Sequence, residues 1–174
     1  MKSIYSRKGA SRLSSVLGFI ASALLLSCIV SCSSFEETVT VNLVNNYEEE
    51  SACFVVSFMD SSTYLIEKAE PSSRDNCFNL QASKTEYETY DFNVWGFTES
   101  EFNKALEEGE ELYGTEDQNT IFANLIKYGD MKDVEYATDS RSFDSNDGFT
   151  GTVRIVFSKA SAASSPNVRI IAED

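Results

Sequence analysis

Alternating hydrophobic and polar side chains predict β-strands over most of the chain after residue 38. The segment 38–43 alternates strictly, which is typical of a strand with one buried face. The segment 52–59 is apolar nearly throughout and is expected to form a central strand. Tyr90, Phe92 and Val94 share one face of another strand, and Gly96 then interrupts the alternation, as a bulge or a close backbone approach would. Further strands are expected at 63–67, 76–80, 133–143, 151–157 and 168–171.

Two segments change from strand periodicity to helical periodicity. Thr98 and Glu101 have the spacing of a capping box, and an apolar helical face follows them up to Gly109. A second helix is expected at 119–128, with Gly129 at its end. Asp147-Gly148 is a typical hairpin turn, and we expect it to join the strand near 133–143 to the one that follows.

The pattern as a whole predicts one mainly β domain at 38–174. Seven or eight strands joined by short turns favour an antiparallel β-sandwich, either immunoglobulin-like or transthyretin-like. The two helices form an insertion near 99–129. Residues 159–167 are small and polar and are expected to form a loop.

The first 31 residues have a different pattern. Met1 to Arg12 is polar and basic, Leu13 to Val30 is mostly apolar, and small residues follow. A positive head, a short apolar stretch and small residues at the end are typical of a signal peptide that directs export. We therefore assign 1–31 to a signal peptide.

Two cysteines end this segment, in Leu25-Leu26-Ser27-Cys28 and Ile29-Val30-Ser31-Cys32. Both resemble the lipobox of bacterial lipoproteins, in which the cysteine is acylated and becomes the first residue of the mature chain. The resemblance covers only about the first 34 residues. We expect lipidation at Cys32, with Cys28 as the alternative, and residues 32–37 would form the lipidated cysteine and a short tether. The resemblance implies attachment to a bilayer of the bacterial cell envelope. We expect this bilayer to be the outer membrane or the cell surface rather than the inner membrane.

The amino-acid composition excludes several classes of functional site. The 174 residues include 14 basic and 28 acidic side chains and no histidine. Catalytic triads and zinc or haem sites that depend on histidine are excluded, and the net charge of −14 argues against binding nucleic acid. Because the first 31 residues carry four basic side chains and no acid, the acidity belongs to the predicted domain.

Cys53 and Cys77 would be the remaining pair of cysteines in a mature chain that starts at Cys32. In each predicted strand the cysteine lies on the face opposite the large apolar side chains, and exported proteins favour disulfides. We therefore expect a disulfide between Cys53 and Cys77. The alternative is two buried free thiols.

Three further groups of side chains are candidate sites. Acidic residues gather around the first helix, where they would solvate it, bind cations or contact a basic partner: Glu99, Glu101, Glu107, Glu108, Glu110, Glu111, Glu116 and Asp117. Residues 144–148 have some features of a calcium loop but lack the EF-hand spacing, which favours a turn. Aromatic residues at 64, 87, 90, 95, 97 and 113 either form a binding platform or fill the core.

The sequence therefore predicts a lipid-anchored envelope protein whose β-sandwich binds a partner or acts as a scaffold. We expect no enzymatic activity, no catalytic residues, no cofactor and no metal site; the partner, protein or glycan, is not identified. The alternative is an exported hydrolase that works through carboxylates, with or without a metal ion.

Overall fold

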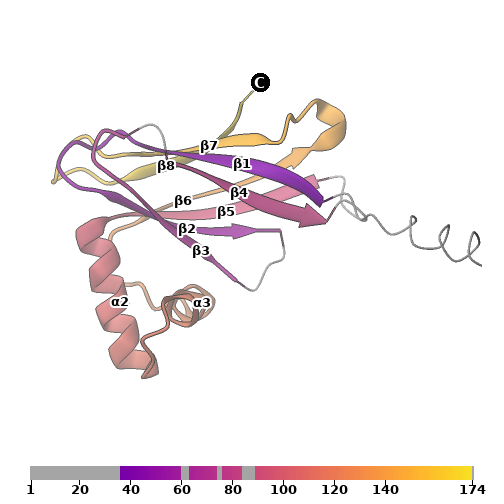
Figure 1. Ribbon diagram of the computed structural model, residues 1–174. Helices are drawn as coiled ribbons and strands as arrows, with labels where there is room; N and C mark the ends of the chain where they lie inside the picture. Colours follow the sequence, from indigo (N-terminus) through magenta and orange to yellow (C-terminus); the bar gives the residue numbers. More distant parts are fainter. Residues whose placement is uncertain (1–35, 60–62, 74–75, 84–88, 174) are drawn as a thin grey trace, which may run out of the picture. The chain divides into compact units, whose positions relative to one another are not determined.

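The chain forms two four-stranded sheets that pack face to face, with two helices against the outer face of one of them (Figure 1). The computed structural model describes residues 36–59, 63–73, 76–83 and 89–173. The lipobox cysteines Cys28 and Cys32, together with most of the predicted tether, lie outside the described residues.

The first sheet has the strand order β4-β1-β7-β8 and the second the order β3-β2-β5-β6. The first sheet contains β1 (Glu36–Asn45), β4 (Asn76–Ser83), β7 (Thr152–Ser158) and β8 (Asn167–Ala172). The second contains β2 (Ala52–Phe58), β3 (Leu65–Ala69), β5 (Thr89–Thr98) and β6 (Ala137–Asp144). All neighbouring strands are antiparallel except β1 and β7, which are parallel. The predicted mainly β sandwich is confirmed.

The strand order also separates the two predicted topologies. In the constant-type immunoglobulin arrangement the first two strands belong to one sheet. Here β1 and β2 belong to different sheets. The structure therefore excludes that arrangement and leaves the transthyretin-like alternative.

The core between the sheets comes from the alternation seen in the sequence. Val39, Val41 and Leu43 of β1 are almost fully buried, as are Val153 and Ile155 of β7. They face Phe54, Val56, Phe92 and Val94 of the other sheet. The polar side chains between these positions lie on the outer faces, as period-two strands require.

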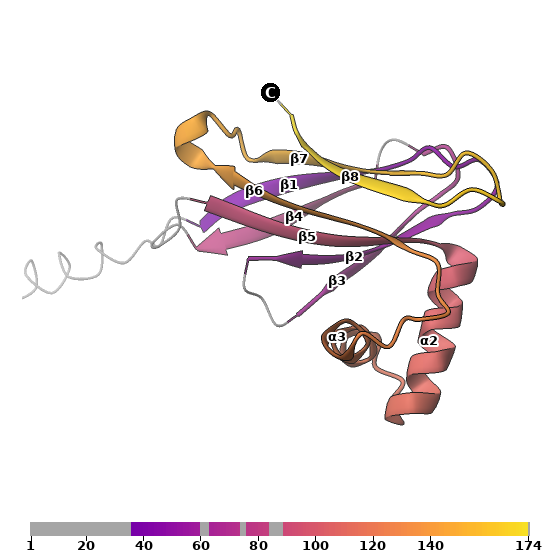
Figure 2. The ribbon, with the colours of Figure 1, turned by 180° about the vertical axis from the view of Figure 1, so that it is seen from behind.

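A second core lies on the other side of β2. Helices α2 (Glu99–Tyr113) and α3 (Gln118–Tyr128) pack there against Val55 and Phe97 (Figure 2). Because β2 has the sandwich core on one face and the helices on the other, all seven of its residues are buried. This double burial explains the continuous apolar run in its sequence.

Two glycines allow close packing. The register of β5 against β2 runs without a break through Gly96, so no bulge forms there. A Cβ at Gly96 would lie 3.0 Å from Phe157 Cδ2, which confirms the predicted close approach. The first helix does not end at Gly109 as predicted, because Gly109 is buried where α2 meets Ile121 of α3, and Gly114 is the actual C-cap.

The predicted hairpin at Asp147-Gly148 is wrong. β6 pairs with β5, whereas β7 pairs with β1 and β8. The turn η1 (Ser145–Asp147) therefore carries the chain from one sheet to the other. A local turn signal cannot distinguish a hairpin from such a crossover.

Candidate functional site

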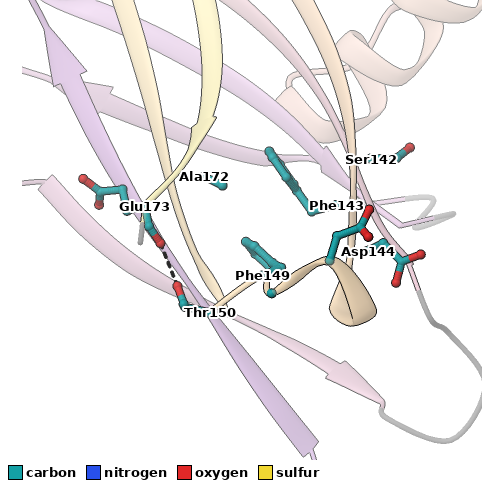
Figure 3. A pocket seen from close by; sticks show the side chains of 9 residues that line it. Ser142, Phe143, Asp144, Phe149, Thr150, Ala172 and Glu173 are labelled. Carbon is teal, nitrogen blue, oxygen red and sulfur yellow. Dashed lines mark hydrogen bonds between the residues drawn. The ribbon is translucent and has the colours of Figure 1, made fainter.

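The candidate site is a hollow of about 180 Å³ beside this crossover (Figure 3). Three segments line it: the end of β6, the crossover up to Thr150, and the end of β8. The lining residues are Ser142, Phe143, Asp144, Asp147, Gly148, Phe149, Thr150, Ala172 and Glu173. Gly148 has a φ of 85°, a left-handed conformation that glycine adopts without strain and that ends η1.

Two aromatic rings form the apolar part of the hollow. Phe143 and Phe149 stack with ring centroids 5.1 Å apart and planes inclined by 14°. Each ring also contacts an aromatic ring of β5 in the sandwich core. The ring centroids of Phe149 and Tyr90 are 5.4 Å apart, and those of Phe143 and Phe92 are 6.0 Å apart. The core therefore holds both rings in place, and a ligand would meet a preformed aromatic surface.

Polar groups surround the rings, and several already have partners. Thr150 Oγ1 donates a hydrogen bond to the Glu173 carbonyl (2.7 Å), and the Asp144 carboxylate accepts one from the Asn146 backbone (2.7 Å). The Glu173 carboxylate accepts from Asn42 and pairs with Arg154. Asp147 is exposed, and among the described residues it is the carboxylate of the hollow that has no such partner. The arrangement suits a small ligand that combines ring contact with hydrogen bonding.

A second, shallower hollow of about 340 Å³ lies over β5 and β6. Its polar side chains are paired across the two strands: Ser140 Oγ donates to Asn93 Oδ1 (2.8 Å), and Ser142 Oγ donates to Asp91. These hydrogen bonds stabilise the cross-strand pairs. They also occupy the groups that a ligand would need.

The acidic residues around α2 separate into two groups. Glu99 forms a 2.7 Å ion pair with Lys68, and this hydrogen bond lowers the pKa of the Glu99 carboxyl. Glu101 accepts a hydrogen bond from the Glu135 backbone, and Asp117 caps α3. The other acids are Glu107, Glu108, Glu110, Glu111 and Glu116, of which only Glu108 is partly covered. Among the described residues no group of three or more acids or cysteines is placed to hold a metal ion.

The aromatic residues that were candidates for a platform do not converge. Tyr90 lies in the sandwich core and Phe97 in the helix-covered core, so they face opposite sides of β5. Tyr64 packs edge-on against Trp95 in that second core. The Tyr113 hydroxyl donates a hydrogen bond to the Asp130 carboxylate. Tyr87 lies outside the described residues. The described members of the group thus fill cores or support the helix pair.

Cys53 is a free, buried thiol in the structure, which therefore does not show the predicted disulfide with Cys77. Cys53 belongs to β2 and Cys77 to β4, which are strands of different sheets. The sequence pattern places both cysteines on corresponding faces of their strands but does not tell which sheet each strand joins. Burial raises the pKa of the Cys53 thiol to about 12, which keeps it protonated at neutral pH and unsuited to nucleophilic attack.

The residues of the hollow were not found as a group from the sequence. The sequence predicts Asp144 and Asp147 only as parts of a turn, and η1 confirms that turn. Phe143 and Phe149 flank the turn at a distance of six residues, which is the one local signal of an aromatic pair. Their proximity to Glu173 depends on how β8 lies beside β7, and no local pattern contains that information.

Comparisons with known proteins give little more. The sequence matches no protein-family model and no curated protein. One solved structure, described as "NMR structure of the protein from Eubacterium rectale", is similar at 12% sequence identity. The similarity covers 79% of this chain and 92% of that one, with a TM-score of 0.40. Neither helix in the described part of the chain has the length and hydrophobicity needed to cross a membrane.

Proposed function

We propose that the protein is an exported bacterial lipoprotein, anchored through an acylated Cys32, whose β-sandwich is a non-enzymatic binding module. The observation that carries the proposal is the position of the lipobox. The motif ends at Cys32, and the first strand of the sandwich begins at Glu36. A lipid anchor placed directly before a folded domain holds that domain at the surface of a bilayer, because each buried methylene contributes about 0.8 kcal/mol.

Binding is favoured over hydrolysis by the state of two carboxylates. The ion pair with Lys68 lowers the pKa of the Glu99 carboxyl, and hydrogen bonds from Thr120 lower that of Asp117. Both therefore stay ionised, whereas a hydrolase of this type needs one protonated acid beside an ionised one. The preformed rings of Phe143 and Phe149 support binding of a small ligand instead.

The anchor is tested by metabolic labelling with palmitate in a bacterial host. Cys32→Ala should abolish the label, because no thiol would remain at the lipidation position. The matched variant Cys28→Ala should keep the label. If Cys28→Ala loses the label instead, the anchor is at Cys28; if the wild-type protein takes up no label, the proposed lipoprotein is wrong.

A further inference from the structure

We infer that the end of the sandwich where β1 begins is the surface that faces the lipid bilayer, and that the loops at the opposite end face outward. This inference rests on the proposed anchor at Cys32. It names the partner of that end of the fold as a lipid surface, beside which the hollow of Phe143 and Phe149 opens.

The length of the tether carries the first step. Three residues separate Cys32 from Glu36, and a fully extended chain advances at most about 3.6 Å per residue, so the anchor lies within about 14 Å of the start of β1. β1 has ten residues, which at about 3.3 Å each give a strand of about 33 Å. The tether is therefore much shorter than the sandwich, and only the end at Glu36 is held next to the bilayer.

Strand register shows what else lies at this end, which we call the near end. Glu36 pairs with Ser83, the last residue of β4. In the parallel pair of β1 and β7, the Thr40 backbone donates to the Gly151 carbonyl (2.8 Å), so the crossover before Gly151 lies at the near end. β8 also ends here, because Ala172 pairs with Val153. The hollow formed by the crossover and the end of β8 thus belongs to the near end (Figures 1 and 3).

The opposite end, which we call the far end, consists of loops held together by hydrogen bonds. These loops are 46–51, 70–73 and 159–166, together with the start of α2. Asn45 N donates to the Ser73 carbonyl (3.0 Å) and Asn46 N to the Phe157 carbonyl (2.9 Å). The buried Asn45 side chain also donates to the Glu50 and Ala69 carbonyls, which joins two of these connections. Loops fixed on a rigid scaffold are common sites of recognition.

Charge favours an upright domain over one that lies on its helices. The segment 99–117 carries eight carboxylates and one lysine, and it starts at the far end, where Glu99 N donates to the Ser51 carbonyl (2.9 Å). Bacterial leaflets that carry anionic lipids repel such a segment, since each charge near the surface contributes on the order of 1 kcal/mol. Keeping the near end against the bilayer moves these eight carboxylates away from the leaflet and leaves next to it a smaller acidic group: Glu36, Glu37, Asp144, Asp147 and Glu173, the last of which is paired with Arg154.

The test measures how close each end lies to the lipid headgroups. A bimane fluorophore is attached to Asn146→Cys at the near end or to Ala163→Cys at the far end, each in a Cys77→Ser background; both positions are exposed, and the buried Cys53 does not compete. The acylated full-length protein is reconstituted in phosphatidylethanolamine–phosphatidylglycerol vesicles that contain a headgroup-attached spin-label quencher. Quenching should be at least threefold stronger at residue 146 than at residue 163.

Two controls separate the orientation from the anchor. The same proteins with about 15 Gly and Ser residues inserted after Ser34 should lose most of the difference between the two labels, because the longer tether lets the domain rotate. Equal or reversed quenching with the native tether would overturn the inference while leaving the anchor intact. Absence of acylation, read independently by palmitate labelling, would overturn both the inference and the proposed function.

Discussion

Single side chains at the helix ends show how local chemistry fixes the start of each helix. Thr98 and Asp117 occupy the N-cap positions of α2 and α3, and each accepts a hydrogen bond from a backbone amide three residues later. Asp117 also accepts from the Thr120 side chain, and these two hydrogen bonds lower the pKa of the Asp117 carboxyl. The charged form of Asp117 is therefore favoured in the folded state.

Replacing this cap gives a prediction with a defined pH dependence. Asp117→Ala should lower the thermal unfolding midpoint by roughly 3–5 °C near pH 7. Because the folded state lowers the pKa from its usual 3.8, the stabilisation is complete above pH 3.8 and is lost as the pH falls through the lower folded value. The difference between wild type and variant should thus shrink in strong acid, as measured by circular dichroism at several pH values.

Asp133→Ala is the matched control, since Asp133 is also exposed but caps neither helix. Its midpoint near pH 7 should equal that of the wild type. A similar loss in both variants would mean that net charge, and not the cap, causes the effect.

Cys53 supports a second prediction at the residue scale. Because its thiol is free and buried, adding a reductant should leave the free energy of unfolding of the exported domain unchanged. A disulfide to Cys77 would close a loop of about 25 residues and contribute about 3 kcal/mol on the chain-entropy model. Urea titrations with and without dithiothreitol measure the difference, and a fall of that size under reducing conditions would contradict the structure.

At the scale of elements, α2 has an unfavourable charge distribution. Its last turn contains no basic residue, while Glu110 and Glu111 lie close to its C-terminus. Carboxylates there oppose the helix dipole, which is negative at this end. The helix is nevertheless stable because Phe102 and Ala105 are buried against the rest of the domain.

Reversing one of these charges should stabilise the helix. Glu111→Lys places a cation in the last turn and opposite Glu107 at an i,i+4 spacing, so we expect the free energy of unfolding to rise by about 0.5 kcal/mol. Glu107→Lys makes the same charge change two turns before the helix ends and should give a smaller gain. Equal gains from both variants would show that net charge alone is responsible.

The elements also show how far the sequence determines the fold. β1, β2 and α3 were predicted to within a few residues because their periodicity is strong and uninterrupted. Gly109 misled the prediction of where α2 ends, since a buried glycine at a helix contact has the same local signature as a glycine that ends a helix. The hairpin predicted at Asp147-Gly148 failed because it depended on which sheet the next strand joins, and the candidate hollow was missed for the same reason.

At the scale of the whole molecule, the two cores share one strand. β2 packs against the sandwich core through Phe54 and against the helix core through Val55. Loss of packing on either side therefore exposes the same strand. We expect the sandwich and the helix pair to unfold together.

Leu125→Ala tests this coupling from the helix side. Leu125 is almost fully buried, and its truncation should lower the free energy of unfolding by about 2–5 kcal/mol. Fluorescence of the single tryptophan, Trp95, reports on the helix core, and amide hydrogen exchange in β1 reports on the sandwich. Both signals should shift by the same amount, as they should for Ile155→Ala in the other core. A shift confined to Trp95 would show that the helix pair unfolds on its own.

The parallel pairing of β1 with β7 has a consequence for the time course of folding. Thr40 of β1 lies beside Thr152 of β7. β1 is the first strand to be synthesised, and it can pair with β7 only after the first six strands and both helices have been made. Loop closure over such a distance is entropically costly and slow, and until it occurs the apolar face of β1 is incompletely covered. A nascent or translocating chain would thus remain vulnerable to aggregation until its last two strands emerge, and truncation of that C-terminal hairpin would leave the earliest strand without its neighbour on that side.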